Sequence, residues 1–267
     1  MSKLEKALYE LNLMERASEQ PGFLHSVDPR AKLGVTFVYL VTLLSLPLGN
    51  LSGLILFGVY PVLLSAMAGV GYGRFFIRSL VVLPFILFIG IFNPIVDRQI
   101  VFYVGNLGIT SGWISFFSII LRGLFSVQAV MILVFATGFY NVCRGMRKLG
   151  IPALFVTQLL FVYRYIFVLL EEALAMRRAR DARGYGRASY PPGMWGIFMG
   201  QLLVRTVDRA GRIHKAMLAR GFKGNIEGMV RMRWQRRDTL FLVVWIVLLV
   251  FLRVLHPAES FNLFMNH

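Results

Sequence analysis

Residues 33–73 read LGVTFVYLVTLLSLPLGNLSGLILFGVYPVLLSAMAGVGYG, a run of 41 residues without a charged side chain. A helix that spans a bilayer needs about 20 predominantly apolar residues, so this run is long enough for two such helices. Pro47-Leu48-Gly49-Asn50 lies in its middle and has the composition of a tight turn. We therefore predict two membrane-spanning helices, roughly at residues 32–48 and 51–71.

Three further apolar runs follow in the sequence. They lie at residues 79–96, 113–137 and 239–255, the first interrupted by Pro84 and by Asn93-Pro94. Prolines are tolerated in a membrane helix when neighbouring helices satisfy the freed carbonyls. Only 16% of the chain is charged and 57% is hydrophobic, whereas a soluble domain carries about 25% charged residues. The sequence predicts an all-α integral membrane protein with about five transmembrane helices.

The basic residues of the short loops predict the orientation, because Lys and Arg concentrate on the cytoplasmic side of a membrane. They precede the first span and follow the second and the fourth, at Arg30, Lys32, Arg74, Arg78, Arg144, Arg147 and Lys148. We predict a multi-pass protein of a prokaryotic cell membrane, with its N-terminus in the cytoplasm and its C-terminus outside. The net charge of +16 suits an anionic lipid bilayer. Nucleic acid is not expected as a partner, because most aromatics lie inside the apolar runs.

Residues 141–237 are the most basic part of the chain, with 19 of the 29 Lys and Arg side chains and five of the 13 acids. The apolar run 151–170 is long enough to cross a membrane, but Arg177-Arg178-Ala179-Arg180 would then lie outside. Arg164 would also place a charge at mid-bilayer, which costs about 2.5–3.5 kcal/mol. We therefore predict that the whole segment is cytoplasmic and contains long helices. The chain then divides into residues 1–140 with four spans, the cytoplasmic segment 141–237, and residues 238–267 with the last span.

The sequence contains no pattern typical of an enzyme. A membrane enzyme needs a nucleophile with a base, a carboxylate pair or metal ligands facing a cavity, and the five predicted spans contain no Asp, Glu or His. The single cysteine, Cys143, excludes a disulfide within the chain. A phosphate-binding loop of the GxxxxGK(S/T) type is also missing. We expect no enzymatic activity, no cofactor and no bound metal.

A short motif closes two helices of the cytoplasmic segment. Ala182-Arg183-Gly184 and Ala219-Arg220-Gly221 are each followed by an aromatic residue, and the two arginines are 37 positions apart. The glycine can adopt the left-handed conformation that ends a helix, and the alanine leaves room for another backbone. The arginine can bind a carboxylate of a partner through two parallel hydrogen bonds. A single copy could be an ordinary basic helix ending, but two copies favour contact with a partner protein.

The ordered set of motifs resembles the transmembrane T component of energy-coupling-factor transporters, in its cobalt/nickel (CbiQ-type) branch. The resemblance covers residues 24 to 255 and rests on DPRAKL at 28–33, RGMRKLGIP at 144–152, YRYIFVLLEE at 163–172 and the two Ala-Arg-Gly endings. A T component that serves vitamin uptake is the alternative. A self-contained ion-coupled transporter is a more distant one, for which Arg122 is the lone ionisable residue in mid-span.

The resemblance implies an L-shaped scaffold between a substrate-capture membrane subunit and two cytoplasmic ATP-binding cassette ATPases. Its long coupling helices place their Ala-Arg-Gly ends in grooves of the ATPases, and ATP-driven motion of these helices moves the capture subunit. By this resemblance the ATPase contacts are Ala182, Arg183, Gly184, Ala219, Arg220 and Gly221. The transported ion is expected to be cobalt or nickel.

Overall fold

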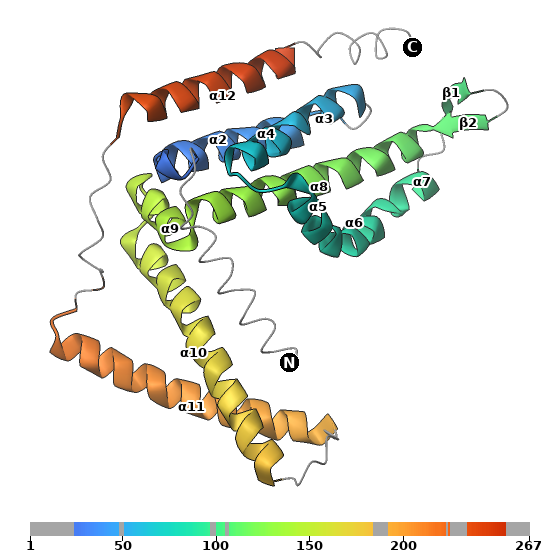
Figure 1. Cartoon of the computed structure of the whole chain (residues 1–267). Coiled ribbons are helices and arrows are strands. Elements are labelled where there is room, and N and C mark those ends of the chain that lie inside the picture. Colours follow the sequence, from blue (N-terminus) through green and yellow to red (C-terminus); the bar gives the residue numbers. More distant parts are fainter. Residues whose placement is uncertain are drawn as a thin grey trace. The chain divides into compact units, whose positions relative to one another are not determined.

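The computed structural model is helical almost throughout (Figure 1). It describes residues 24–47, 51–96, 100–104, 107–183, 192–222, 224 and 234–254. The chain divides into two compact units. We call residues 18–145 together with 232–267 the bundle unit, and residues 1–17 together with 146–231 the two-helix unit.

The bundle unit contains the segments predicted as spans. The first and last are α2 (Pro29–Leu44), which follows the short η1 (Leu24–Ser26), and α12 (Arg236–Val254). The second comprises α3 (Leu51–Phe57) and α4 (Val59–Met67). The third comprises α5 (Tyr72–Ser79), η2 (Leu80–Val82), α6 (Leu83–Gly90) and α7 (Phe92–Val96). The fourth is α8 (Ser111–Thr137), and α9 (Phe139–Lys148) leads out of the bundle.

The directions of these helices agree with the predicted alternation. α2 and α12 run parallel, because Asp28 meets Asp238 at their beginnings and Ser45 meets Arg253 at their ends. α8 runs the opposite way, since its residue Ala136 lies at Lys32 and its residue Arg122 lies at Leu44. The first, fourth and last spans therefore run in the relative directions that the sequence predicts. The cytoplasmic position of the N-terminus remains a prediction.

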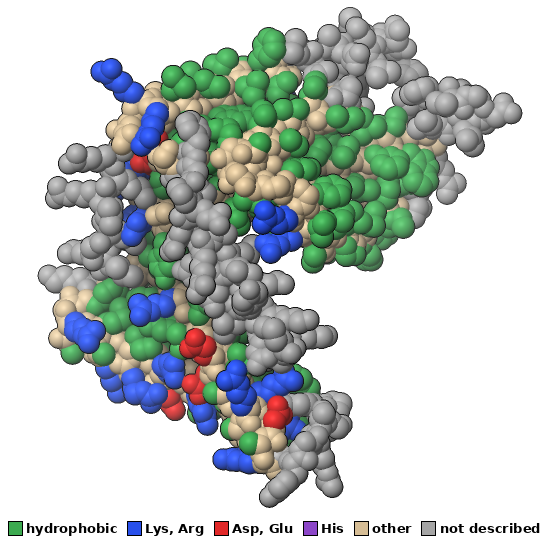
Figure 2. Space-filling model, viewed as in Figure 1, with side chains coloured by type: hydrophobic (Ala, Val, Ile, Leu, Met, Phe, Trp, Pro, Cys, Tyr) green, Lys and Arg blue, Asp and Glu red, His purple; other side chains and the backbone are tan. Residues whose placement is uncertain are grey.

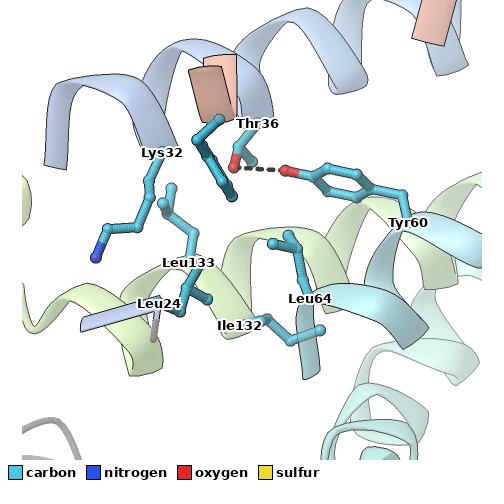
Figure 3. A pocket seen from close by; sticks show the side chains of 8 residues that line it. Leu24, Lys32, Thr36, Tyr60, Leu64, Ile132 and Leu133 are labelled. Carbon is cyan, nitrogen blue, oxygen red and sulfur yellow. Dashed lines mark hydrogen bonds between the residues drawn. The ribbon is translucent and has the colours of Figure 1, made fainter. Parts of the chain in front are cut away.

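Aromatic side chains fill the centre of the bundle. The ring of Tyr60 stacks on Tyr39 at 4.0 Å between centroids and meets Trp245 edge-on at 4.9 Å. The Tyr60 hydroxyl lies 3.0 Å from the hydroxyl of Thr36, beside a small, largely apolar pocket (Figure 3). The pocket has a volume of about 10 Å³, which is room for at most one water molecule. The packing ties α2, α4 and α12 together and leaves no space there for a transported solute.

Three described helical segments are long and apolar enough to cross a membrane. They are Tyr72–Pro94, Ser111–Thr137 and Ala153–Arg183. The first begins at Tyr72, seven residues before the predicted start, and Pro84 occupies the first turn of α6, where a missing amide donor is harmless. The third lies in the segment predicted as cytoplasmic. Length and composition alone would let it cross, so its location stays a prediction from the basic clusters around it.

A short hairpin lies between the third and fourth predicted spans. β1 (Ile100–Val104) and β2 (Leu107–Thr110) pair antiparallel, with Phe102 opposite Ile109 and Val104 opposite Leu107. β-Branched and aromatic residues favour a strand. The described chain is therefore all-α except for this short hairpin.

The two-helix unit consists of α10 (Ala153–Arg183) and α11 (Pro192–Ala219). α10 has 31 residues and is about 46 Å long at 1.5 Å per residue. The predicted long helix is thus confirmed, and it ends at Arg183, within the first Ala-Arg-Gly motif. Lys and Arg side chains lie along both helices (Figure 2).

Candidate partner-binding site

The end of α11 has the backbone conformation that the motif predicts. Gly221 has a φ of 76°, in the left-handed region where glycine is favoured. The amide of Phe222 donates to the carbonyl of Met217 at 3.0 Å, and the amide of Gly221 donates to Leu218 at 2.9 Å. These two bonds form a Schellman motif. The helix therefore stops at Ala219, and Arg220 projects at its end as an exposed side chain.

The end of α10 carries the first copy of the motif. Ala182 and Arg183 are the last two residues of the helix, and both are exposed. Gly184 lies outside the described residues. No other described side chain forms an ion pair with Arg183 or Arg220. Both guanidinium groups are therefore available to a partner as far as the described chain is concerned.

Glu172 holds α10 and α11 together. Its Oε1 accepts a hydrogen bond from Nη1 of Arg205 at 2.8 Å, and its Oε2 accepts one from Nη2 of Arg209 at 2.9 Å. These two arginines are one helical turn apart, so a single carboxylate bridges both. The helical spacing of Arg205, Arg209 and Arg212 places them on one face of α11, but the sequence does not identify the acid opposite them. Glu172 stands in the stretch YRYIFVLLEE that carries the resemblance.

The aromatic residue after the second motif has a role within the chain. The ring of Phe222 lies 6.3 Å from the ring of Phe161 on α10. The aromatic residue that follows the second motif thus packs within its own unit. Together with the Glu172 bridge, this contact fixes the far end of α11 against the first half of α10.

Both helices of the two-helix unit expose apolar side chains. On α11 no described residue is buried, and Ile197, Leu203 and Val207 each expose more than 60% of their surface. On α10 the exposed side chains include Phe155 and Val162. The small residues Ala175, Ala179 and Ala182, which lie at i, i+4 and i+7 along α10, are also exposed. A helix pair with such a surface needs a covering layer, either protein or lipid.

The stretches DPRAKL and RGMRKLGIP meet in the bundle unit. The side chain of Asp28 caps α2 by accepting from the amide of Arg30 at 2.9 Å. A Cβ atom on Gly145 would lie 3.2 Å from Cβ of Pro29 and 2.7 Å from Cδ1 of Leu33, so α9 packs closely on α2 at this glycine and a larger residue would require Leu33 to move. These two motifs therefore join the first span to the helix that leads out of the bundle.

Lys32 is buried, although its place before the first apolar run predicts a basic residue of a loop. Its Nζ donates to the carbonyl of Ala136 at 3.3 Å, near the C-terminal end of α8. A cation is favourable at that end of a helix. The nearby carboxylates of Asp28 and Asp238 attract the same charge. Lys32 thus fastens the start of α2 to the end of α8.

Chemistry at a metal or a reactive thiol finds no support in the described residues. Within the ranges given above, no three His, Cys, Asp or Glu side chains are grouped so that they could hold a metal ion. Cys143 is buried on α9, and burial raises the pKa of its thiol to about 11. The thiol is therefore protonated at neutral pH and a poor nucleophile.

The apolar bundle and the paired basic helices define an all-α integral membrane protein. Residues 20–232 match the family of the cobalt transport protein CbiQ, and the chain belongs to this family. The resemblance drawn from the sequence is therefore confirmed at the level of the family.

Individual relatives extend the comparison to parts or to most of the chain. An uncharacterized protein of Methanocaldococcus jannaschii is 27% identical over 256 residues, which are 91% of this chain and 86% of that protein. The cobalt transport protein CbiQ of Salmonella typhimurium is 34% identical over 90 residues, which are 33% of this chain and 40% of the relative. The nickel permease LarQ of Lactiplantibacillus plantarum is 29% identical over 115 residues, 42% of each chain. The similarity to named transport proteins thus spans less than half of their length.

Proposed function

We propose that this chain is the transmembrane coupling subunit of an energy-coupling-factor transporter that imports cobalt or nickel. The observation that carries the proposal is the pair of Ala-Arg endings, each exposed at the end of a long helix. A guanidinium that is exposed and has no ion-pair partner among the described residues can grip a carboxylate on another protein. The names of the relatives, cobalt transport protein and nickel permease, support the choice of ion.

Such a subunit requires rigid helices that transmit motion from the ATPases. α10 and α11 are bridged at Glu172 and packed at Phe161, so a push on one helix end moves both helices together. The contacts of Gly145 with Pro29 and of Lys32 with Ala136 provide stiff joints inside the bundle unit. In the proposed cycle two ATPases bind the Ala-Arg-Gly ends, and a substrate-capture membrane subunit binds elsewhere on the chain. ATP hydrolysis belongs to the ATPases, and this chain acts without catalysis.

Co-purification tests this proposal directly. The tagged chain is expressed with its native neighbours, extracted in mild detergent, and the proteins retained with it are identified by mass spectrometry. We expect two ATP-binding cassette ATPase copies and one further membrane subunit. Recovery of the chain alone, from cells that take up metal, would contradict the coupling role.

A further inference from the structure

Two arginines of the bundle unit converge on the same short turn. Arg122 of α8 donates through Nη2 to the carbonyl of Pro47 at 2.8 Å and through Nη1 to the carbonyl of Leu44 at 3.4 Å. Arg253 of α12 donates through Nη2 to Oγ of Ser45 at 3.1 Å. Two positively charged side chains thus contact residues 44–47, at the end of α2 and directly after it.

The described carboxylates of the bundle unit do not balance these charges. They belong to Asp28 and Asp238, which lie together at the opposite ends of α2 and α12. Carbonyl and hydroxyl oxygens supply dipoles but leave a net charge of about +2 in an apolar setting. Each guanidinium has five N–H groups, and among the described residues only two contacts are made by Arg122 and one by Arg253. Donors and charge therefore remain for an anion.

The surroundings indicate what kind of anion fits. Leu44, Phe251 and Val254, which flank the two arginines along α2 and α12, expose 61%, 58% and 62% of their surface. In a membrane protein such apolar side chains face acyl chains. A ligand that suits both features carries an anionic head beside long apolar tails. Planar guanidinium groups bind phosphate through paired hydrogen bonds, which makes a phosphate the best match.

We propose that Arg122 and Arg253 form a binding site for the phosphate group of a phospholipid at this end of the bundle. The bound lipid neutralises the two charges and covers the ends of α2 and α12. This site does not depend on the coupling role proposed above, because it requires only that the bundle unit lies in a membrane.

Native mass spectrometry of the detergent-purified chain tests the site with defined lipids. We expect phosphatidylglycerol to bind with a dissociation constant at least about tenfold lower than that of diacylglycerol with the same chains. Arg253→Gln and the double variant Arg122→Gln/Arg253→Gln should lose this preference. Among the described residues Arg253 makes one hydrogen bond, to an exposed serine, so its variant should fold, which thermal unfolding verifies. Arg236→Gln, on an exposed arginine at the other end of α12, is the matched control and should bind like the parent.

Each remaining outcome decides against the lipid site. Equal binding of the two lipids, or equal loss in Arg236→Gln and Arg253→Gln, would overturn it. Inorganic phosphate that binds the parent as tightly as phosphatidylglycerol, and is lost in Arg253→Gln, would assign the site to soluble phosphate instead. If Arg253→Gln keeps the lipid preference but loses a co-purifying membrane subunit, the arginines bind a protein carboxylate, and the lipid proposal is wrong.

Discussion

The carboxylate of Asp238 accepts a hydrogen bond of 2.9 Å from the backbone amide of Asp28, 210 positions earlier in the chain. Its other oxygen accepts from the amide of Gln235 at 2.8 Å, at the start of α12. Asp238 is 2% exposed, so both bonds are shielded from water. One side chain thereby sets the register between the first and the last helix of the bundle, and its neighbour Asp28 caps α2 in turn.

Replacing Asp238 by alanine should destabilise the bundle. The substitution leaves the buried amide of Asp28 without an acceptor, which costs about 1–3 kcal/mol. The measurement is thermal unfolding of the purified protein in detergent. Arg237→Ala, on the exposed neighbour, is the control and should change stability by less than about 0.5 kcal/mol. Equal melting temperatures for both variants and the parent would show that this bond does not stabilise the fold.

Glu172→Ala should loosen the contact between α10 and α11 without unfolding either helix. Arg205 and Arg209 are 60% and 40% exposed, and such solvent-screened pairs contribute at most about 1 kcal/mol each. Hydrogen–deuterium exchange should therefore rise in peptides that cover the middle of both helices, while the melting temperature changes little. Glu171→Ala changes the adjacent, exposed carboxylate and should leave exchange as in the parent. Unchanged exchange in Glu172→Ala would mean that apolar packing alone holds the pair.

The contrast between these two contacts explains how much the sequence could predict. The spans, their alternation and the long basic helices follow from apolar run length and loop charge, which are local properties. The left-handed glycine at the end of α11 also follows from the motif itself. The partners of Glu172, the burial of Lys32 and the hydrogen bond between Asp28 and Asp238 join residues far apart in sequence. Such pairings depend on how the helices pack, and a single sequence carries no signal for them.

The pairing of β1 with β2 could not be predicted from the sequence for a different reason. Its strands have five and four residues, which is too short for alternation to stand out between two apolar spans. Arg122, by contrast, stands out in the sequence as the lone ionisable residue in mid-span. The structure places it on the carbonyls of Leu44 and Pro47.

Cys143 should react slowly with thiol reagents. Burial raises the pKa of its thiol to about 11 because a buried thiolate loses its hydration. Below that value the thiolate fraction grows about tenfold per pH unit, so maleimide labelling should keep accelerating beyond pH 9. A cysteine at the exposed position Ala210 should react faster at pH 7 and level off near its ordinary pKa of about 8.5. Equal rates for Cys143 and Ala210→Cys at pH 7 would contradict the burial of Cys143.

Because Cys143 should react slowly, cysteines introduced elsewhere can be labelled selectively, which permits a test of where α10 lies. Val162 is 59% exposed on α10, and Ser189 follows that helix in the sequence. Cysteines at both positions should be labelled in everted vesicles by a membrane-impermeant maleimide and protected in intact cells, because the segment is predicted to be cytoplasmic. Labelling of Ser189→Cys from outside intact cells would instead mean that α10 crosses the membrane.

Arg183 and Arg220 are proposed to couple the ATPases to transport. Metal uptake by cells, combined with pull-down of the ATPases, tests this role most directly. Truncating one partner of a buried charge pair costs about 2–5 kcal/mol. Arg183→Ala and Arg220→Ala should therefore each weaken ATPase binding and abolish metal uptake. The melting temperature of each variant should stay as in the parent. Lysine at either position should restore ATPase binding and uptake only in part, because it keeps the charge but loses the paired hydrogen bonds. The control Lys215→Ala changes an exposed residue of α11 and should behave like the parent. If Arg183→Ala and Arg220→Ala both assemble and transport like the parent, the two Ala-Arg-Gly endings do not couple ATP hydrolysis to transport.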